Sequence, residues 1–235
     1  MREWRSYWRG KPKLETADFE ASLRQVGKTT LGKPVGQEQI QLMVDRISAA
    51  LALRHDDKVA DLGCGNGLLT VRVAKLIKEI QGVDVSPSLI ESAREFHCSR
   101  NCSYLVSDIA DGSCILHLPP DTRKFYSYEV LQHLSTKELS RLLTALSQSR
   151  PQGFFFFVAS VPDQSKLRAF YDTPERYAFY ERNVASGQEQ IGHWWEQDEL
   201  QGECSRLGLS CKFMEQDRRL YTAHYRFDAL ITSRV

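Results

Sequence analysis

Three glycines spaced one residue apart follow a short apolar run and an acidic residue in segment 59–67. The segment reads Val-Ala-Asp-Leu-Gly-Cys-Gly-Asn-Gly, with Asp61 two residues before Gly63. The apolar run is typical of a buried strand, and glycine permits the sharp turn and positive φ of a strand-to-helix junction. Because glycine has no side chain, a ligand can approach this backbone closely. The segment therefore predicts a strand, a turn and a helix that together hold a nucleotide-like cofactor.

The glycine spacing separates two classes of cofactor site. Dinucleotide-binding folds show G-x-G-x-x-G and place a pyrophosphate on the helix N-terminus, whereas this chain has G-x-G-x-G. The tighter spacing, with Asp61 before it, resembles motif I of the Rossmann-like S-adenosylmethionine-dependent methyltransferases. Two alternatives stay open at this point. One is a nicotinamide-dependent oxidoreductase, and the other is a non-catalytic regulatory or scaffold subunit that binds S-adenosylmethionine.

Two further acidic residues follow apolar segments at the spacing of this family. Asp84 lies in the short segment 81–85 and Asp108 follows the apolar segment 104–106. The resemblance implies that Asp84 accepts hydrogen bonds from the ribose hydroxyls, and that Asp108 accepts one from the adenine amine. The alternative for each acid is a helix cap. The cofactor-binding residues that the resemblance implies are Asp61, Gly63, Cys64, Gly65, Gly67, Asp84, Val85, Ser107, Asp108, Ile109 and Tyr128.

The segment 128–134 resembles the E-V-L-E-H segment of small-molecule methyltransferases of the ubiquinone-biosynthesis type. A hydroxyl acceptor must lose a proton as it is methylated, and neutral imidazole accepts protons near pH 7. His133 is therefore the candidate general base, with a helix-start histidine bonded to backbone as its alternative and His193 as the first replacement. Glu129 is the second catalytic candidate, either as an acid/base partner or as an acceptor for the methionine end of the cofactor.

No metal site is expected. In some members of the ubiquinone-type group two acids and the histidine of this segment bind a divalent metal, but here Gln132 replaces the middle acid. Loss of that carboxylate removes a charged oxygen ligand for magnesium. His97, Cys98 and Cys102 are close in sequence but lack the C-x-x-C pairing of a zinc site.

Helical and strand patterns alternate along the chain, which predicts a doubly wound α/β fold. The expected sheet is seven-stranded and mostly parallel, with a closing antiparallel strand and helices on both faces. Helix 37–53, the apolar central strand 153–159 and two closing strands at 210–214 and 225–231 carry this prediction. Capping boxes, in which a serine and the glutamate three residues later cap a helix start, are expected at Ser88/Glu91 and Ser135/Glu138.

The chain is expected to form a single methyltransferase domain over 1–235. Its parts are an N-terminal helical extension (1–36), a cofactor-binding core (37–160), an aromatic lid and substrate insert (161–195), and a closing helix and hairpin (196–235). The insert is rich in tyrosine, phenylalanine and tryptophan. Inserts above the carboxyl edge of such a sheet form substrate pockets, although these aromatics are equally compatible with ordinary core.

Charge and composition limit the classes of binding partner that the chain is expected to have. The 235 residues include 31 Lys and Arg against 30 Asp and Glu, a formal net charge of +1. This balance gives no reason to expect nucleic acid as a partner. No run is long enough to span a bilayer, and the amino terminus lacks the apolar core of a signal peptide. We expect a cytoplasmic enzyme with reduced thiols. Its methyl acceptor is expected to be a small molecule, and the methylated group a hydroxyl of a sugar, lipid-linked saccharide or secondary metabolite.

Overall fold

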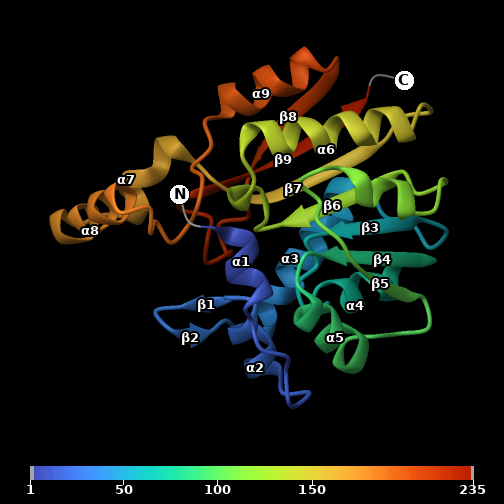
Figure 1. Ribbon diagram of the computed structural model, residues 1–235, viewed down its shortest axis with the longest axis horizontal. Coiled ribbons are helices and arrows are strands. Elements are labelled where there is room, and N and C mark those ends of the chain that lie inside the picture. Colours follow the sequence, from blue (N-terminus) through green and yellow to red (C-terminus); the bar gives the residue numbers. More distant parts are fainter. Residues whose placement is uncertain (1–2, 234–235) are drawn as a thin grey trace.

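A seven-stranded sheet forms the centre of the computed structural model, which describes residues 3–233. The strand order is β5-β4-β3-β6-β7-β9-β8 (Figure 1). The strands are β3 (Lys58–Leu62), β4 (Glu79–Asp84), β5 (Cys102–Val106), β6 (Lys124–Tyr128), β7 (Phe155–Pro162), β8 (Leu209–Glu215) and β9 (Arg226–Ser233). Strands β3 to β7 are parallel, and β9 runs antiparallel to both β7 and β8. The predicted fold class and its closing hairpin are confirmed.

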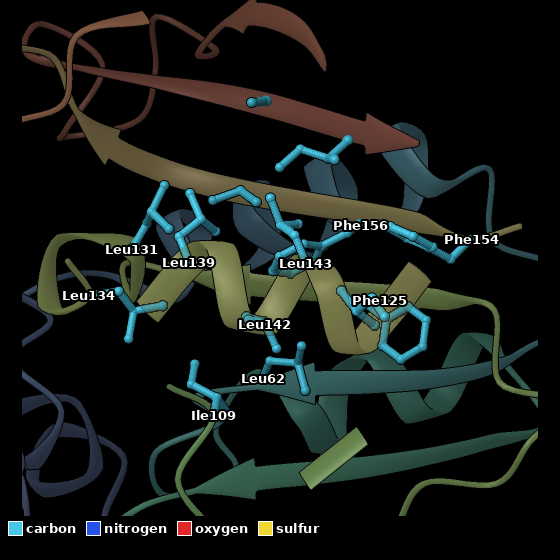
Figure 2. Packing of buried hydrophobic residues seen from close by; sticks show 14 of the residues in the cluster. Leu62, Ile109, Phe125, Leu131, Leu134, Leu139, Leu142, Leu143, Phe154 and Phe156 are labelled. Carbon is cyan, nitrogen blue, oxygen red and sulfur yellow. The ribbon is translucent and has the colours of Figure 1, made fainter. Parts of the chain in front are cut away.

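Helices cover both faces of the sheet because its central strands are apolar on both sides. Consecutive residues of a strand point to opposite faces, so Phe156 joins one core cluster and Phe157 the other. The first face packs under α6 (Thr136–Ser149) and α9 (Gln197–Arg206), as Figure 2 shows for the leucines of α6. The second face packs under α3 and α4. The remaining core helices are α3 (Gln37–Leu51), α4 (Thr70–Val73) and α5 (Pro87–Phe96), with 3-10 turns η1 (Ala74–Leu76), η2 (Ser113–His117) and η3 (Leu131–His133).

Local helix signals were only partly correct. The Ser135/Glu138 capping box is present, with both reciprocal hydrogen bonds. The Ser88/Glu91 box is wrong: Ser86 caps α5 by accepting from the Leu89 amide. Pro87 at the first helical position fixes the cap at Ser86, two residues earlier than the serine–glutamate spacing indicated.

The N-terminal extension is part of the folded domain. It contains α1 (Trp4–Arg9), α2 (Phe19–Gln25) and a two-stranded hairpin of β1 (Thr29–Thr30) and β2 (Lys33–Pro34). Leu23 of α2 is fully buried in the core cluster under α3. The Asn66 side chain, in the glycine loop, donates to the Ser22 carbonyl at 2.9 Å. The extension is therefore anchored to the loop that the sequence assigns to cofactor binding.

The insert between β7 and α9 contains η4 (Gln164–Lys166), α7 (Leu167–Phe170) and α8 (Pro174–Ala185). Figure 1 shows α7 and α8 projecting to the left of the sheet, and α8 buries none of its residues. Tyr171 and Trp194 pack with Tyr225 in a separate aromatic cluster, whereas Trp195 is fully buried in the main core. Some aromatic residues of the insert thus belong to the main core, and others form a separate cluster outside it.

Candidate active site

A cavity of about 630 Å³ opens at the carboxyl ends of the parallel strands. Strand order reverses between β3 and β6, and ligands of open α/β sheets bind at this point. The cavity wall combines three remote parts of the chain with the strand ends. These are the N-terminal extension, the insert, and the loop between β8 and β9.

The glycine loop, residues 63–67, forms one wall of the cavity, but its three glycines have different structural roles. All three have positive φ, at 85° for Gly63, 56° for Gly65 and 77° for Gly67. A Cβ on Gly65 would meet only the end of the Val26 side chain, at 3.0 Å, so this position leaves room for a ligand. A Cβ on Gly67 would lie 2.6 Å from the Tyr104 hydroxyl. Gly67 therefore permits close packing against Tyr104 of β5 and Ala93 of α5, and it does not line the cavity.

Two carboxyl groups at the ends of the adjacent strands β3 and β4 line the cavity. Asp61 is buried and accepts from Thr70 Oγ1 at 2.6 Å and from the Tyr126 hydroxyl at 2.7 Å. Burial raises the pKa of Asp61 to about 7 despite these two hydrogen bonds. Asp84 accepts from the Gly65 amide at 2.9 Å, which ties the second strand to the glycine loop. Burial also raises the pKa of Asp84.

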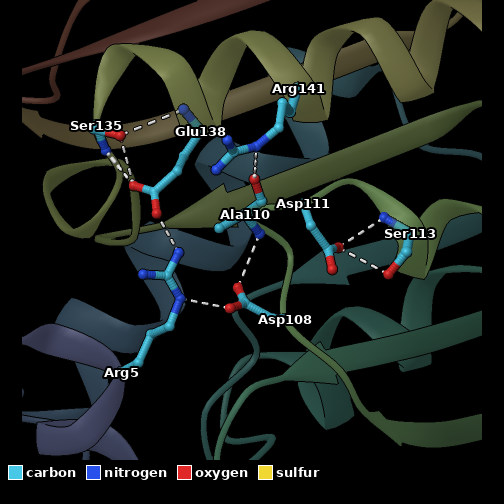
Figure 3. Close-up of polar contacts among 8 residues, drawn as sticks. All are labelled: Arg5, Asp108, Ala110, Asp111, Ser113, Ser135, Glu138 and Arg141. Atoms are coloured by element: carbon cyan, nitrogen blue, oxygen red, sulfur yellow. Dashed lines mark hydrogen bonds and ion pairs between the residues drawn. The ribbon is translucent and has the colours of Figure 1, made fainter.

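Asp108 lies at the edge of the cavity and pairs with the N-terminal helix. Arg5 Nε lies 2.5 Å from Asp108 Oδ2, and the same guanidinium pairs with Glu138 of the α6 capping box. Figure 3 shows Arg5 between the two carboxylates. Ile109 and Val85 line the cavity, whereas Ser107 does not. Asp108 thus lines the cavity as the sequence analysis expected, but the sequence gave no sign of its partner Arg5.

Glu129, directly after β6, has a left-handed backbone (φ 60°), which a non-glycine residue rarely adopts. Its Oε2 lies 3.1 Å from Lys28 Nζ, and its Oε1 accepts from the Tyr221 hydroxyl at 3.1 Å. Burial by itself raises the pKa of Glu129, but the charges of Lys28 and Arg226 outweigh it and hold the pKa below its usual value. The lowered pKa favours Glu129 as a hydrogen-bond acceptor, one of the two roles expected for it.

His133, in η3, lines the cavity beneath the tryptophans of α1. Its ring centroid lies 4.2 Å from that of Trp4 and 5.6 Å from that of Trp8. Its proposed replacement, His193, lies outside the cavity lining and pairs with Glu199 at 3.1 Å. His224, from the loop between β8 and β9, does line the cavity. If a second histidine is needed, His224 is better placed than His193.

Several cavity residues were missed, most of them because nothing near them in sequence marks them as functional. They are Trp4, Arg5, Lys28, Tyr221, His224 and Arg226. Two carried a readable signal. Lys28 lies in a short polar string of the N-terminal extension, and Arg226 is a charged residue at the start of an apolar closing strand. The predicted residues Cys64 and Tyr128 also line the cavity.

Potential metal ligands are not gathered at this site. Gln132 accepts a hydrogen bond from Arg226 Nη1, so the position of the missing acid faces a guanidinium. Among residues 3–233 we find no cluster of three or more His, Cys, Asp or Glu side chains suited to a metal ion. His97 contacts the Asn66 carbonyl at 2.7 Å, and all six cysteines are free thiols. None of the helices in this range combines the length and apolar character needed to cross a membrane.

The fold and the cavity define a Rossmann-like methyltransferase architecture, and comparison with known proteins agrees. Residues 59–153 match the family described as methyltransferase domain. This segment contains the glycine loop, and the fold around it is that of the class I S-adenosylmethionine-dependent methyltransferases. S-adenosylmethionine is the methyl donor of this class. The nicotinamide alternative is not supported.

Curated relatives match over part of their length. A protein-L-isoaspartate O-methyltransferase of Myxococcus xanthus is 32% identical over 87 residues, 35% of this chain and 41% of the relative. A magnesium-protoporphyrin O-methyltransferase of Rhodobacter capsulatus is 30% identical over 120 residues, 48% of this chain and 49% of the relative. The chain thus spans about half or less of the length of these relatives.

Solved structures resemble the chain over nearly its full length. Magnesium protoporphyrin IX methyltransferase from Synechocystis PCC 6803, with bound S-adenosylmethionine, aligns with a TM-score of 0.57 at 16% identity, covering 99% of this chain and 92% of the other. A methyltransferase from Anabaena variabilis aligns with a TM-score of 0.61 at 18% identity, covering 95% and 97%. At this identity the likeness establishes the fold.

Proposed function

We propose that this chain transfers a methyl group from S-adenosylmethionine to a hydroxyl of a small molecule. One observation carries the proposal. A single cavity collects the open glycine position Gly65, the strand-end acids Asp84 and Asp108, and the candidate catalytic residues Glu129 and His133. The first three suit an adenosyl group, and the last two suit an acceptor oxygen.

The residues present fit the cofactor. Each oxygen of Asp84 accepts one backbone amide, from Gly65 and Ser86, and retains a lone pair for a ribose hydroxyl. We assign Asp108 to the adenine amine and Ile109 to an apolar contact with the base, because both residues line the cavity. The Gly65 backbone leaves space where a side chain would intrude. When bound, the cofactor supplies a methyl carbon on a sulfonium leaving group.

The protein's own contribution is alignment, exclusion of water and removal of one proton. His133 is proposed to accept the proton of the acceptor hydroxyl. Lys28 and Tyr221 fix the Glu129 carboxylate from two sides, which holds it as an acceptor for the methionine end of the cofactor or for the substrate. Trp4 and Trp8 cover His133 and limit the access of water to it.

Oxygen is favoured over nitrogen or carbon as the methylated atom. Both relatives described above are O-methyltransferases by name. Aromatic side chains from α1, the insert and the loop between β8 and β9 line the cavity, and such faces suit a sugar ring, a lipid-linked saccharide or a planar metabolite. The near-zero net charge gives no electrostatic attraction for nucleic acid.

Two measurements test the proposal. Calorimetry with S-adenosylmethionine, S-adenosylhomocysteine and NAD should give binding for the first two only. Incubation with a metabolite extract should then give a product heavier by one methyl group in the mass spectrum. Asp84→Asn tests the cofactor site. We expect it to weaken the binding of S-adenosylmethionine and S-adenosylhomocysteine by roughly ten- to a hundredfold, because the ribose is common to both. Binding without methyl transfer to any extract would favour the scaffold alternative.

A further inference from the structure

The inner wall of the cavity contains an arginine whose hydrogen bonds are incomplete. Arg226 begins β9 and is only 4% exposed. Its Nη1 donates to the side chain of Gln132 and to the Ser160 carbonyl. Its Nε is fully buried and has no hydrogen-bond partner among the described residues. A buried donor left unpaired is costly, so each such atom in a cavity indicates a missing ligand group or water.

The charges around this arginine do not balance. Lys28 and Arg226 are both buried and face one carboxylate, Glu129. Both Glu129 oxygens are already engaged, by Lys28 and by Tyr221. The next acid along β9, Asp228, pairs with Arg46 at 2.8 Å. Two buried positive charges of the inner wall thus share one carboxylate, and beyond it Arg226 has a cation–π contact with the Tyr225 ring at 4.9 Å but no second anion among the described residues. Excess buried charge is costly unless it is paired.

The cofactor does not remove this imbalance. Its methionine end carries one ammonium and one carboxylate, and its sulfonium adds a further positive charge. The cavity therefore becomes more positive when the methyl donor binds. An anionic acceptor would pair with the arginine and offset the sulfonium at the same time.

The backbone that holds Arg226 is strained, which is typical of a built functional site. Ser160 and Glu129 both adopt φ 60°, and the register of β7 against β9 shifts between Val158 and Val161. This irregularity surrounds Ser160, whose carbonyl accepts from Arg226. The backbone around the Arg226 guanidinium is thus held in an energetically unfavourable conformation.

We propose that Arg226, with Lys28 beside it, binds an oxyanion of the methyl acceptor. The acceptor is therefore a small molecule that carries a carboxylate or phosphate near the methylated hydroxyl. This inference rests on the proposed function and narrows its substrate class. Thr29, Thr30 and His224 line the same cavity and offer further polar contacts, while Phe170 offers an aromatic face.

A binding experiment tests the inference without turnover. Protein saturated with S-adenosylhomocysteine is titrated with D-glucuronate, D-glucose and inorganic phosphate by ligand-observed NMR. We expect glucuronate or phosphate to bind at least about tenfold more tightly than glucose, because a charge-assisted pair replaces a neutral contact. Arg226→Gln should abolish the preference, whereas Arg226→Lys should keep part of it. Arg218→Gln, at an exposed arginine of the loop that precedes β9, is the matched control. Equal binding of all three probes, or binding of none, overturns the inference.

Two further experiments distinguish an oxyanion of the acceptor from the carboxylate of the cofactor. If Arg226→Gln weakens S-adenosylhomocysteine but not 5′-methylthioadenosine, which lacks the amino acid, the arginine binds the cofactor carboxylate and the inference is wrong. The extract is also divided on an anion exchanger before the methylation assay. Methyl transfer confined to the retained fraction supports an anionic acceptor, and transfer confined to the unretained fraction overturns it. Absence of transfer in both fractions counts against the proposed function, while the titration still decides the oxyanion site.

Discussion

Arg5 and Asp108 form an ion pair across 103 residues of sequence, with Arg5 Nε 2.5 Å from Asp108 Oδ2. The same guanidinium pairs with Glu138 at the start of α6. The pairs hold α1 over the cavity, where Trp4 of that helix packs on His133. The N-terminal helix therefore covers the proposed adenine acceptor and the proposed base together.

Removal of this pair should loosen the cover. In Arg5→Ala we expect faster hydrogen exchange over Trp4–Arg9 and faster dissociation of S-adenosylhomocysteine, measured by stopped-flow fluorescence. The effect should be modest, roughly two- to tenfold, because the arginine is partly exposed and its pairs are screened by solvent. Arg9→Ala, at an exposed position of the same helix, is the control. Unchanged exchange in Arg5→Ala would mean that tryptophan packing alone holds α1.

Two glycines of one loop should respond differently to the same substitution. Gly65→Ala places a methyl group in the cavity, where it meets only the end of Val26, so we expect cofactor affinity to fall while the protein stays folded. Gly67→Ala drives a methyl group against Tyr104 and Ala93, so stability should fall more. Each change also costs on the order of 1 kcal/mol for a side chain at positive φ. Calorimetry measures the cofactor affinity of both variants, and thermal unfolding measures their stability. An equal loss of affinity in both variants would contradict the prediction.

Asp61 should make stability depend on pH. Its pKa in the folded protein is about 7, above that of the unfolded chain, so the folded state retains a proton that the unfolded state has lost. This contribution is fully present below about pH 4 and is lost as pH rises through 7. Asp61→Asn does not titrate. Its stability relative to the wild type should therefore rise between pH 4 and 7, by up to a few kcal/mol at about 1.4 kcal/mol per pKa unit. Urea unfolding at several pH values measures this, and a constant difference would contradict it.

The insert should become ordered when ligands bind. Helix α8 buries none of its residues, yet Phe170, Arg176 and Ile191 of the insert line the cavity. We expect hydrogen exchange over residues 166–195 to slow when S-adenosylhomocysteine and an acceptor are both present. Exchange in α6, which is packed on the sheet, serves as the internal reference. If the insert exchanges equally with and without ligands, it is a fixed cover.

The sequence predicted the sheet well because the signals for its strands are local. Apolar runs followed by an acid or glycine located β3 and β4, and the ends of these strands meet at one edge of a parallel sheet. Helix boundaries were less reliable. The helix expected after Gly67 is only Thr70–Val73 with a 3-10 turn, because tertiary packing overrides propensity in so short a segment.

The polar partners of the site were not predictable from the sequence. Lys28 and Glu129 lie 101 residues apart, and Tyr221 approaches Glu129 from the opposite end of the chain. Nothing in the local pattern of one segment specifies which distant charge it meets. Their pairing depends on how the N-terminal loop and the closing hairpin fold back over the carboxyl edge of the sheet.

The role of His133 can be separated from that of a bystander by comparing affinity with turnover. If His133 accepts the proton of the acceptor, His133→Ala should leave the affinity for S-adenosylhomocysteine nearly intact and lower turnover about a hundredfold or more. The wild-type rate should also fall as pH drops and the imidazole becomes protonated, since only the neutral ring accepts a proton.

Two controls accompany this variant. His117→Ala, at an exposed histidine of η2, should leave both affinity and turnover unchanged. His224→Ala tests the other histidine of the cavity. If His133→Ala retains wild-type turnover and His224→Ala loses it together with the pH dependence, the proton is removed from the side of the closing hairpin. Trp4 and Trp8 would then cover a structural histidine.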